Sequence, residues 1–385
     1  MNPETGGPCQ GIRNILPALF DIGIHSEVLC LDDPESEYLK NENFVIYALG
    51  KSQSPWKYHP RLYSWLLNHL PNYDIVLVRG LWLYHSYVVA KAIRALKRKN
   101  QFDVPRVYLV PHGMLDPWFQ QSRERKIKSL RNNIYWHLIE KKVVREADGL
   151  LFTCETEMQL AKKTFNDYQP QSEINIGYGI QLPPTCNQFM KKAFEDKIGE
   201  KICWPFLLFL GRIHEKKGVD ILVEAYRRLL NNSITLPKLI IAGPGIESSY
   251  GQKLFNIVKS AKELNDMVLF PGMLSGSAKW GALHTCEAFL LPSHQENFGI
   301  AVVEAMACSK PVLISNQINI YQDIQRAGAG IVASSTTEGV ENILIKWFKL
   351  TVEEKNKMAA NSRKLFESDF TAQSAAIKML DALKL

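Results

Sequence analysis

Short apolar runs alternate with segments of helical period along most of the chain, and this alternation restricts the possible folds more than any other feature. In the first half the runs lie at 26–32, 74–80, 106–113, 149–154 and 173–177. In the second half they lie at 206–212, 238–243, 267–272, 288–292, 311–315 and 330–333. Runs rich in Val, Leu and Ile that helices separate predict parallel sheets with both faces covered, and therefore an α/β protein.

The alternating pattern occurs twice, which predicts two doubly wound, Rossmann-like domains. Pro183 and Pro184 interrupt the pattern and a polar stretch follows them, so the boundary is expected there. Residues 1–183 would form the first domain and residues 184–366 the second. The end of the chain reads as helical, and we expect residues 367–385 to pack back on the first domain.

The beginning of the sequence, "ETGGPCQGIRNILPALFDIG", reads as a glycine turn followed by a helix, and no strand-like run precedes it. A doubly wound domain normally opens with a strand that leads into such a turn. We therefore expect the first strand of the fold to be missing, as a miscalled initiation codon would produce.

Composition excludes several other classes of protein. The seven cysteines include no C-x-x-C pair, which argues against a disulfide scaffold or a zinc site and favours a reducing compartment. No apolar run has the length of a membrane span and no secretion signal is apparent, so we expect a cytoplasmic protein. The net charge of +7 suits binding to phosphates, nucleic acid or an anionic membrane, and does not choose among them.

Two loops of the second half leave strand ends with residues suited to anions. Gly211 ends one strand, and Arg212 and Lys217 follow it just before a helix. A guanidinium fork and an ammonium beside a helix start form an anion site, although a solvated basic loop explains them as well. Gly243 and Gly245 follow the next strand and allow a ligand close to the backbone, unless they only form a tight turn.

The stretch "SHQENFGIAVVEAMACSKPVLIS" places two glutamates between two strand-like runs. The apolar spacing predicts a helix that starts near Phe298 or Gly299, whose free N–H groups suit phosphate or sugar oxygens. Glu296 precedes this helix, and Glu304 lies within it among apolar residues, so that it needs a partner. The two carboxylates could bind two sets of vicinal hydroxyls, or could be a helix-start acid and a solvent-facing residue.

The motifs "GRIHEKKG", "AGPG", "ENFGIAVVEAMA" and "KPVLIS", in this order, resemble family 4 (group 1) retaining glycosyltransferases of the GT-B fold. The first half adds "GGPCQGIRNI", "RGLWLY" and "PHGMLDPW". The resemblance implies two Rossmann-like domains that face each other across a cleft. It implies transfer of a sugar from a nucleotide-diphosphate sugar to a glycan or lipid-linked acceptor, with retention of configuration and without a metal or other cofactor. The type is that of bacterial exopolysaccharide and lipopolysaccharide assembly.

The resemblance also implies roles for the donor-side residues. Arg212 and Lys217 would hold the diphosphate and stabilise the leaving group, Glu304 would bind the ribose hydroxyls, and Glu296 the transferred sugar. The implied donor contacts also include Gly6, Gly7, Gly211, Gly243, Gly245, Phe298, Gly299 and Ile300.

On the acceptor side the resemblance points to the first domain. His112 would lie near the anomeric carbon, while Arg79, Asp116 and Trp118 are candidates for the acceptor cleft. Many relatives carry His at the position of Arg79. For Asp116 and Trp118, helix capping and core packing are the alternative explanations.

Other interpretations stay open at this point. A nucleotide-sugar epimerase shares the architecture, and a non-catalytic nucleotide-sugar-binding protein is a further alternative. Nucleic-acid binding through the basic segment 122–146 is not expected, because the segment lacks a known nucleic-acid-binding pattern. For this segment, one hypothesis is contact with an anionic membrane surface. The alternative is a solvated helix that packs Ile134, Leu138 and Val143 into the core.

Overall fold

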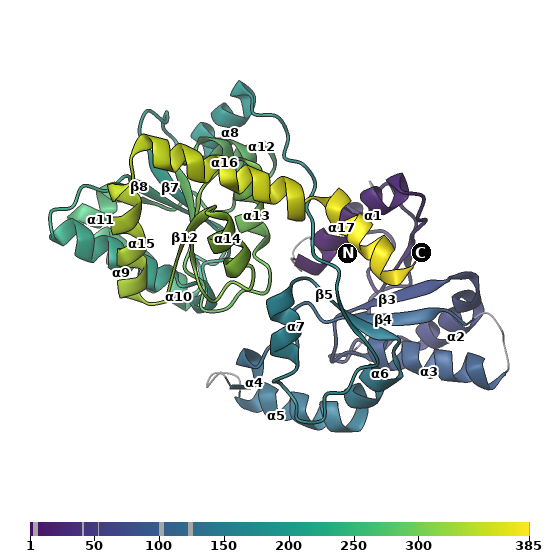
Figure 1. Cartoon of the computed structure of the whole chain (residues 1–385). Helices are drawn as coiled ribbons and strands as arrows, with labels where there is room; N and C mark the ends of the chain where they lie inside the picture. Colours follow the sequence, from purple (N-terminus) through teal and green to yellow (C-terminus); the bar gives the residue numbers. More distant parts are fainter. Residues whose placement is uncertain (3–6, 41, 53, 100–103, 122–125, 385) are drawn as a thin grey trace. The chain divides into compact units, whose positions relative to one another are not determined.

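The computed structural model describes residues 1–2, 7–40, 42–52, 54–99, 104–121 and 126–384 (Figure 1). Gly6, one of the predicted donor contacts, lies outside the described residues. Contacts divide the chain into two compact units: unit 1 comprises Met1–Gly179 with Ala372–Leu385, and unit 2 comprises Ile180–Thr371. The last helix of the chain thus belongs to unit 1.

Unit 1 is built around parallel strands. Its strands are β1 (Val28–Cys30), β2 (Ile46–Ala48), β3 (Ile75–Arg79), β4 (Arg106–Val110), β5 (Gly149–Phe152) and β6 (Glu173–Asn175). Strands β3 to β6 form a four-stranded sheet in sequence order, while β1 and β2 form a separate parallel pair. Its α-helices are α1 (Gly7–Asp21), α2 (Pro60–His69), α3 (Tyr84–Arg98), α4 (Trp118–Gln121), α5 (Lys126–Tyr135), α6 (Lys141–Glu146), α7 (Glu155–Ala161) and α17 (Ala372–Leu383).

The four-stranded sheet of unit 1 is covered on both faces, as the apolar run at β4 illustrates. Val107 and Leu109 join a core with residues of α2, α3 and α6. Tyr108 and Val110, which alternate with them, join a second core with residues of α1 and α17. Because both alternating sets are buried, the strand reads as a continuous apolar run.

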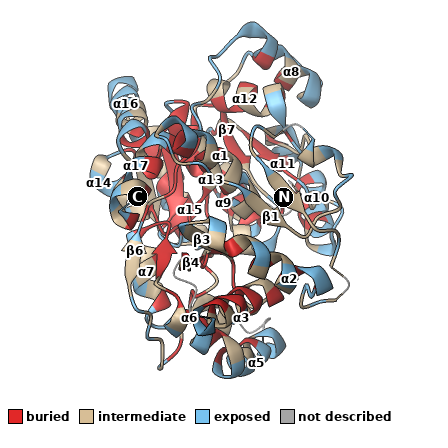
Figure 2. Ribbon diagram, turned by 90° about the vertical axis from the view of Figure 1, so that its right-hand side faces the viewer, coloured by how far each residue is buried: buried red, intermediate tan, exposed pale blue. Residues whose placement is uncertain are grey.

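Unit 2 holds a six-stranded parallel sheet in the order β12-β11-β10-β7-β8-β9. Its strands are β7 (Phe206–Leu210), β8 (Lys238–Ala242), β9 (Val268–Leu269), β10 (Ala288–Leu291), β11 (Val312–Ser315) and β12 (Gly330–Ala333). Its α-helices are α8 (Gln188–Ile198), α9 (Val219–Asn231), α10 (Ser249–Ser260), α11 (Lys262–Met267), α12 (Gly276–Thr285), α13 (Ile300–Ala307), α14 (Tyr321–Ala327), α15 (Thr337–Lys349) and α16 (Val352–Asp369). Figure 2 shows the sheet interior as buried.

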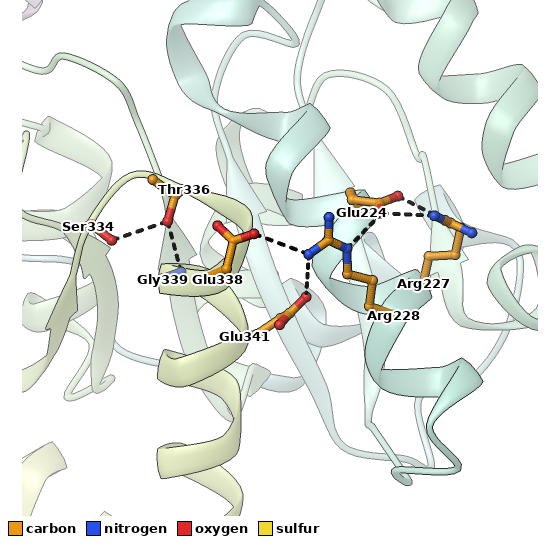
Figure 3. Close-up of polar contacts among 8 residues, drawn as sticks. All are labelled: Glu224, Arg227, Arg228, Ser334, Thr336, Glu338, Gly339 and Glu341. Carbon is orange, nitrogen blue, oxygen red and sulfur yellow. Dashed lines mark hydrogen bonds and ion pairs between the residues drawn. The ribbon is translucent and has the colours of Figure 1, made fainter.

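An exposed ion-pair network links α9 to α15 on the surface of unit 2 (Figure 3). Arg228 on α9 bonds Glu224 on the same helix, and Glu338 and Glu341 on α15. Water screens exposed pairs of this kind, so they orient the two helices more than they stabilise them.

The structure tests the strands and the core residues that were expected from the sequence. Each predicted apolar run contains a strand, and the sequence analysis missed only β2 among the named strands. The alternative in which Ile134 and Leu138 pack into the core is wrong, because they are 53% and 75% exposed. Val143, by contrast, is buried.

Candidate active site

Polar loops meet at the carboxyl edge of the unit 2 sheet, where β7 and β10 lie side by side. The chain proceeds from β7 to β8 on one side, while β10 and β11 lie on the other. The strand order reverses here. Such a place is called a switch point, and doubly wound sheets bind their ligands beside it. The loop after β7 carries Arg212 and Lys217, and the loop after β10 carries Glu296.

Lys217 and Glu296 connect these two loops. The Lys217 ammonium donates to Oε2 of Glu296 in an ion pair whose side chains are 17% and 19% exposed. The backbone of Glu296 is itself fixed, because its N–H donates to the Gln317 carbonyl at 2.9 Å and its carbonyl accepts from the Asn319 N–H at 3.0 Å. The pair is therefore a fixed, half-buried unit at the switch point.

The loops after β7 and β8 are in backbone contact. Gly243 has a φ of +148°, and a Cβ at this position would overlap the carbonyl oxygen of Gly211. A Cβ at Gly245 would lie 2.6 Å from the carbonyl oxygen of Ile213. Only glycine fits these positions, and the result is an edge of bare backbone on which a ligand could lie close to main-chain N–H groups.

Gly299 caps the start of α13 with a φ of +79°, and the helix begins at Ile300. The free N–H groups of a first helical turn attract anionic or polar oxygens. The Phe298 side chain is buried, with its ring centroid 5.6 Å from that of Phe370. The Phe298 side chain is thus part of the core of unit 2.

Glu304 on α13 pairs with Lys279 on α12, whose Nζ lies 2.8 Å from Oε1. The Glu304 side chain is 13% exposed, which explains why its charge needs a partner. Each site glutamate therefore has its own lysine. Arg212 is exposed, and no carboxylate in the described residues lies within ion-pair distance of it, so the site keeps a net positive charge.

In unit 1, a small cavity of about 20 Å³ lies at the carboxyl edge of the four-stranded sheet, lined among others by Gly11, Arg79, His112 and Tyr178. Arg79 ends β3, and its guanidinium has no acceptor among the described residues. Burial lowers the pKa of Arg79. Burial, and then the Arg79 charge, lower the pKa of His112 to about 3, so its imidazole is neutral near pH 7.

The loop that carries His112 is held by a buried carboxylate. Glu157 accepts from the Gly113 N–H at 2.5 Å and from the Thr153 hydroxyl at 2.6 Å. His112 has a φ of +50°, which a non-glycine residue rarely adopts. Its Nε2 is buried without a hydrogen-bond partner in the described part of the chain.

The remaining predicted residues of unit 1 lie in different settings. Gly7 begins α1, and its carbonyl accepts from the Tyr178 hydroxyl at 3.0 Å. Asp116 is buried and accepts from the Trp118 N–H at 2.8 Å, which caps α4. Trp118 packs edge-on against Phe119, and neither Asp116 nor Trp118 lines the cavity beside His112.

Sequence reasoning missed Lys279, Tyr178 and Glu157. A search for the cation that Glu304 requires could have pointed to Lys279, since it lies in the helix before that of Glu304. Glu157 and Tyr178 gave no comparable signal. Among the described residues no group of three or more His, Cys, Asp or Glu side chains is arranged to hold a metal ion.

Part of unit 2 is similar in sequence to proteins that transfer sugars. Residues 191–365 match the family model described as "Glycosyl transferases group 1". D-inositol 3-phosphate glycosyltransferase of Kineococcus radiotolerans is 26% identical over 205 residues, which cover 52% of this chain and 46% of that protein. The chain thus spans about half the length of curated relatives such as this one.

Solved structures are similar over nearly the whole chain. The Anabaena protein Alr3699/HepE in complex with UDP-glucose has a TM-score of 0.74 at 15% identity, covering 98% of this chain and 96% of that one. Sucrose-phosphate synthase from Thermosynechococcus elongatus has a TM-score of 0.69 at 19% identity, covering 98% of this chain and 93% of that one. These similarities show the fold, which is GT-B with two Rossmann-like units.

Proposed function

We propose that the chain is a group 1 glycosyltransferase that moves a sugar from a nucleotide-diphosphate sugar to a glycan or lipid-linked acceptor, with retention of anomeric configuration. The family match of residues 191–365 supports the reaction class. The observation that carries the proposal is the Lys217–Glu296 pair at the switch point of unit 2, on a loop that also carries Arg212. A cation for phosphate and an acid for hydroxyls are thereby joined within one site.

The donor diphosphate is assigned to Arg212 and Lys217. Fixed cations stabilise the negative charge that grows on the leaving diphosphate, and they need no rearrangement during the reaction. Gly243 and Gly245 leave the backbone open for close approach of the phosphates. Because two side-chain cations supply this charge, we expect transfer without a metal ion.

The hydroxyl-binding roles are assigned to the two acids. Glu296, held beside Lys217, accepts hydrogen bonds from the transferred sugar, and Glu304 accepts them from the ribose. A carboxylate accepts two charge-assisted bonds and therefore suits vicinal hydroxyls. His112 is neutral at the pH of the reaction, so it serves as a hydrogen-bonding group and not as a cation.

A screen of nucleotide sugars tests this proposal, beginning with UDP-glucose because a structurally similar protein was solved with it. A true donor at about 100 times its Kd should stabilise the protein by roughly 2.7 kcal/mol. Released nucleotide and the mass of the sugar-bearing product then report transfer. An epimerase would instead change the donor without changing its mass, and a binding protein would release no nucleotide.

We also propose that unit 1 contacts an anionic membrane surface through α5. Ile127, Leu130, Ile134 and Leu138, here called the apolar stripe, are 87%, 65%, 53% and 75% exposed. Their spacing places them on one side of α5 and the π-helical turn Trp136–Glu140 that continues it. Figure 1 shows α5 at the periphery of its unit.

Cations accompany the apolar stripe. Lys126, Lys128 and Arg131 are exposed, and in the described residues no carboxylate lies within ion-pair distance of them. An apolar face with adjacent Lys and Arg side chains is the pattern of a helix that lies in a membrane interface. Within the described residues every helix is too short or too polar to cross a bilayer.

Sedimentation with lipid vesicles tests the membrane contact. We expect binding to phosphatidylglycerol-rich vesicles at low salt, weakened by Leu130→Ser with Leu138→Ser. Phe189→Ser is the matched control, because Phe189 is 70% exposed on α8 in unit 2. Equal binding to neutral vesicles, or an unchanged double variant, would show that the stripe has another role.

A further inference from the structure

A second cavity lies within unit 1, between the loop that follows β3 and helix α5. Its volume of about 560 Å³ falls in the range of about 300–1,000 Å³ that small-molecule sites occupy. It is lined by Pro55, Trp56, Leu81, Trp82, Leu83, His112, Met114, Phe119, Arg131, Asn132 and Tyr135. Of these residues, only His112 was predicted as part of a site.

Three aromatic rings form much of the cavity wall. The centroids of Trp56 and Trp82 each lie 6.2 Å from that of Tyr135, in edge-on arrangements. Trp56 Nε1 donates to the Tyr135 hydroxyl at 2.7 Å, which fixes both rings. Rings held in this way present rigid apolar surfaces, and the C–H face of a pyranose packs well on such a surface.

The backbone around the cavity is strained. Trp82 has a φ of +70° and His112 a φ of +50°, and both residues line the cavity. Glu140, which is fully buried, accepts a hydrogen bond from the Ser86 hydroxyl at 3.2 Å. Non-glycine residues persist in this conformation where their surroundings hold them, and they gather at ligand-binding sites.

Polar groups that lack an acceptor or an opposite charge among the described residues also lie at this cavity. Arg131 donates to Asn132 Oδ1 at 3.0 Å, which leaves the Asn132 amide nitrogen as a free donor in the described structure. Arg131 has no carboxylate partner among the described residues, and the buried Nε2 of His112 has no partner either. The residues that line the cavity thus offer hydrogen-bond donors and one cation, and none of these lining residues is acidic.

We propose that this cavity binds the acceptor, and that the acceptor is a saccharide bearing an anionic group. The sugar ring packs on Trp82 and Tyr135, Asn132 donates to a hydroxyl, and Arg131 pairs with the anion. The inference rests on the proposed glycosyltransferase function. The anion is a phosphate, as in a lipid-linked sugar phosphate, or a carboxylate, as in a uronic acid. Arg131 lies on the helix of the apolar stripe, which favours the phosphate.

Equilibrium binding distinguishes the two anions and tests the site. Glucose 1-phosphate, glucuronic acid, methyl glucoside and inorganic phosphate are titrated in the presence of saturating UDP, with tryptophan fluorescence as the readout. We expect an anionic sugar to bind roughly tenfold or more tightly than methyl glucoside, because its anion accepts a charge-assisted hydrogen bond that methyl glucoside cannot accept. Whichever anionic sugar binds better identifies the anion.

Two variants locate the binding. Arg131→Gln should remove the preference for the anionic sugar, and Trp82→Leu should weaken the binding of every sugar. Arg326→Gln, at a residue whose side chain is 75% exposed on α14, and Trp204→Leu are the matched controls. Arg131 is exposed, so Arg131→Gln should fold. The thermal midpoint of Trp82→Leu shows whether that variant is folded.

The outcomes separate this inference from the function on which it rests. Release of UDP from UDP-glucose without an acceptor reports the donor reaction alone. If UDP is released and neither Arg131→Gln nor Trp82→Leu changes sugar binding, only the cavity assignment is overturned. Binding that both variants weaken, with no turnover of any nucleotide sugar, supports the cavity and overturns the proposed function. Inorganic phosphate binding as tightly as glucose 1-phosphate would also overturn the role of the aromatic wall.

Discussion

Lys217 and Glu296 form one ion pair although 79 positions separate them in the sequence. The pairing arises because parallel strands β7 and β10 are neighbours, so the loops at their carboxyl ends share one edge of the sheet. A positive and a negative group thereby occupy a single site. Each should affect a different part of the bound donor.

Lys217→Met should reduce turnover strongly. If Lys217 stabilises the departing diphosphate, its loss should lower kcat by roughly 100-fold or more, the usual effect of removing one fixed transition-state donor. Lys253→Met is the matched control, since Lys253 is exposed on α10 and forms no ion pair in the described structure. Steady-state kinetics with the identified donor measure both variants, and a Lys217→Met enzyme with normal kcat contradicts the assignment.

Glu304→Gln should weaken donor binding. The carboxylate is assigned to the ribose hydroxyls, and loss of a charged hydrogen-bond acceptor costs about 1.5–3 kcal/mol, or roughly 10-fold to 100-fold in Kd. Lys279→Met breaks the same ion pair but keeps the carboxylate, so it should change the Kd much less. Titration calorimetry compares the two. Equal losses would mean that the ion pair, and not the carboxylate, matters for binding.

Gly243→Ala should destabilise unit 2. The substitution combines a φ of +148° with a direct overlap between the new Cβ and the Gly211 carbonyl oxygen. Gly199→Ala is the control for backbone strain alone, because its φ is +79° and no atom lies within 4 Å of the added Cβ. We expect a cost of about 1 kcal/mol at Gly199 and clearly more at Gly243, measured as the shift in the thermal midpoint. Equal shifts would show that the loop moves to make room.

Much of the fold can be predicted from sequence because strands such as β4 are buried on both faces of their sheet. Val107 to Val110 alternate between two cores, and an apolar run remains visible when every position is buried. Strand β2 was missed for the opposite reason: its three residues are only half-buried, and it pairs with β1 alone. A short strand with one neighbour leaves little hydrophobic pattern.

The site was only partly accessible to sequence reasoning. Motifs at strand ends pointed to Lys217 and Glu296, since topology brings such ends together. The Lys279 partner of Glu304 comes from a separate helix, and no local spacing rule selects it. The second cavity of unit 1 is formed by segments around residues 56, 82, 112 and 132, which share no motif and meet only in the folded unit.

The pH dependence of turnover should not report His112. Burial holds its pKa at about 3, well below the usual 6.5, so the ring remains neutral between about pH 5 and 9. His112→Gln keeps hydrogen-bonding capacity without an ionisable group, and its kcat/KM profile should have the shape of the wild-type profile. An acid limb near pH 6.5 that disappears in His112→Gln would show that the imidazole titrates during the reaction.

Glu140→Gln should stabilise unit 1 above neutral pH. Burial raises the pKa of Glu140 from 4.5 to about 7, so between these values the folded state binds a proton that the unfolded state has lost. Stability therefore falls as pH rises through this window, by roughly 3 kcal/mol in total, and the loss is complete above pH 7. The amide of glutamine carries no charge, so the variant should lose this slope. Glu37→Gln is the control, because the Glu37 side chain is 86% exposed. Thermal midpoints from pH 5 to pH 8.5 compare the three proteins, and a wild-type slope in Glu140→Gln would mean that another group causes it.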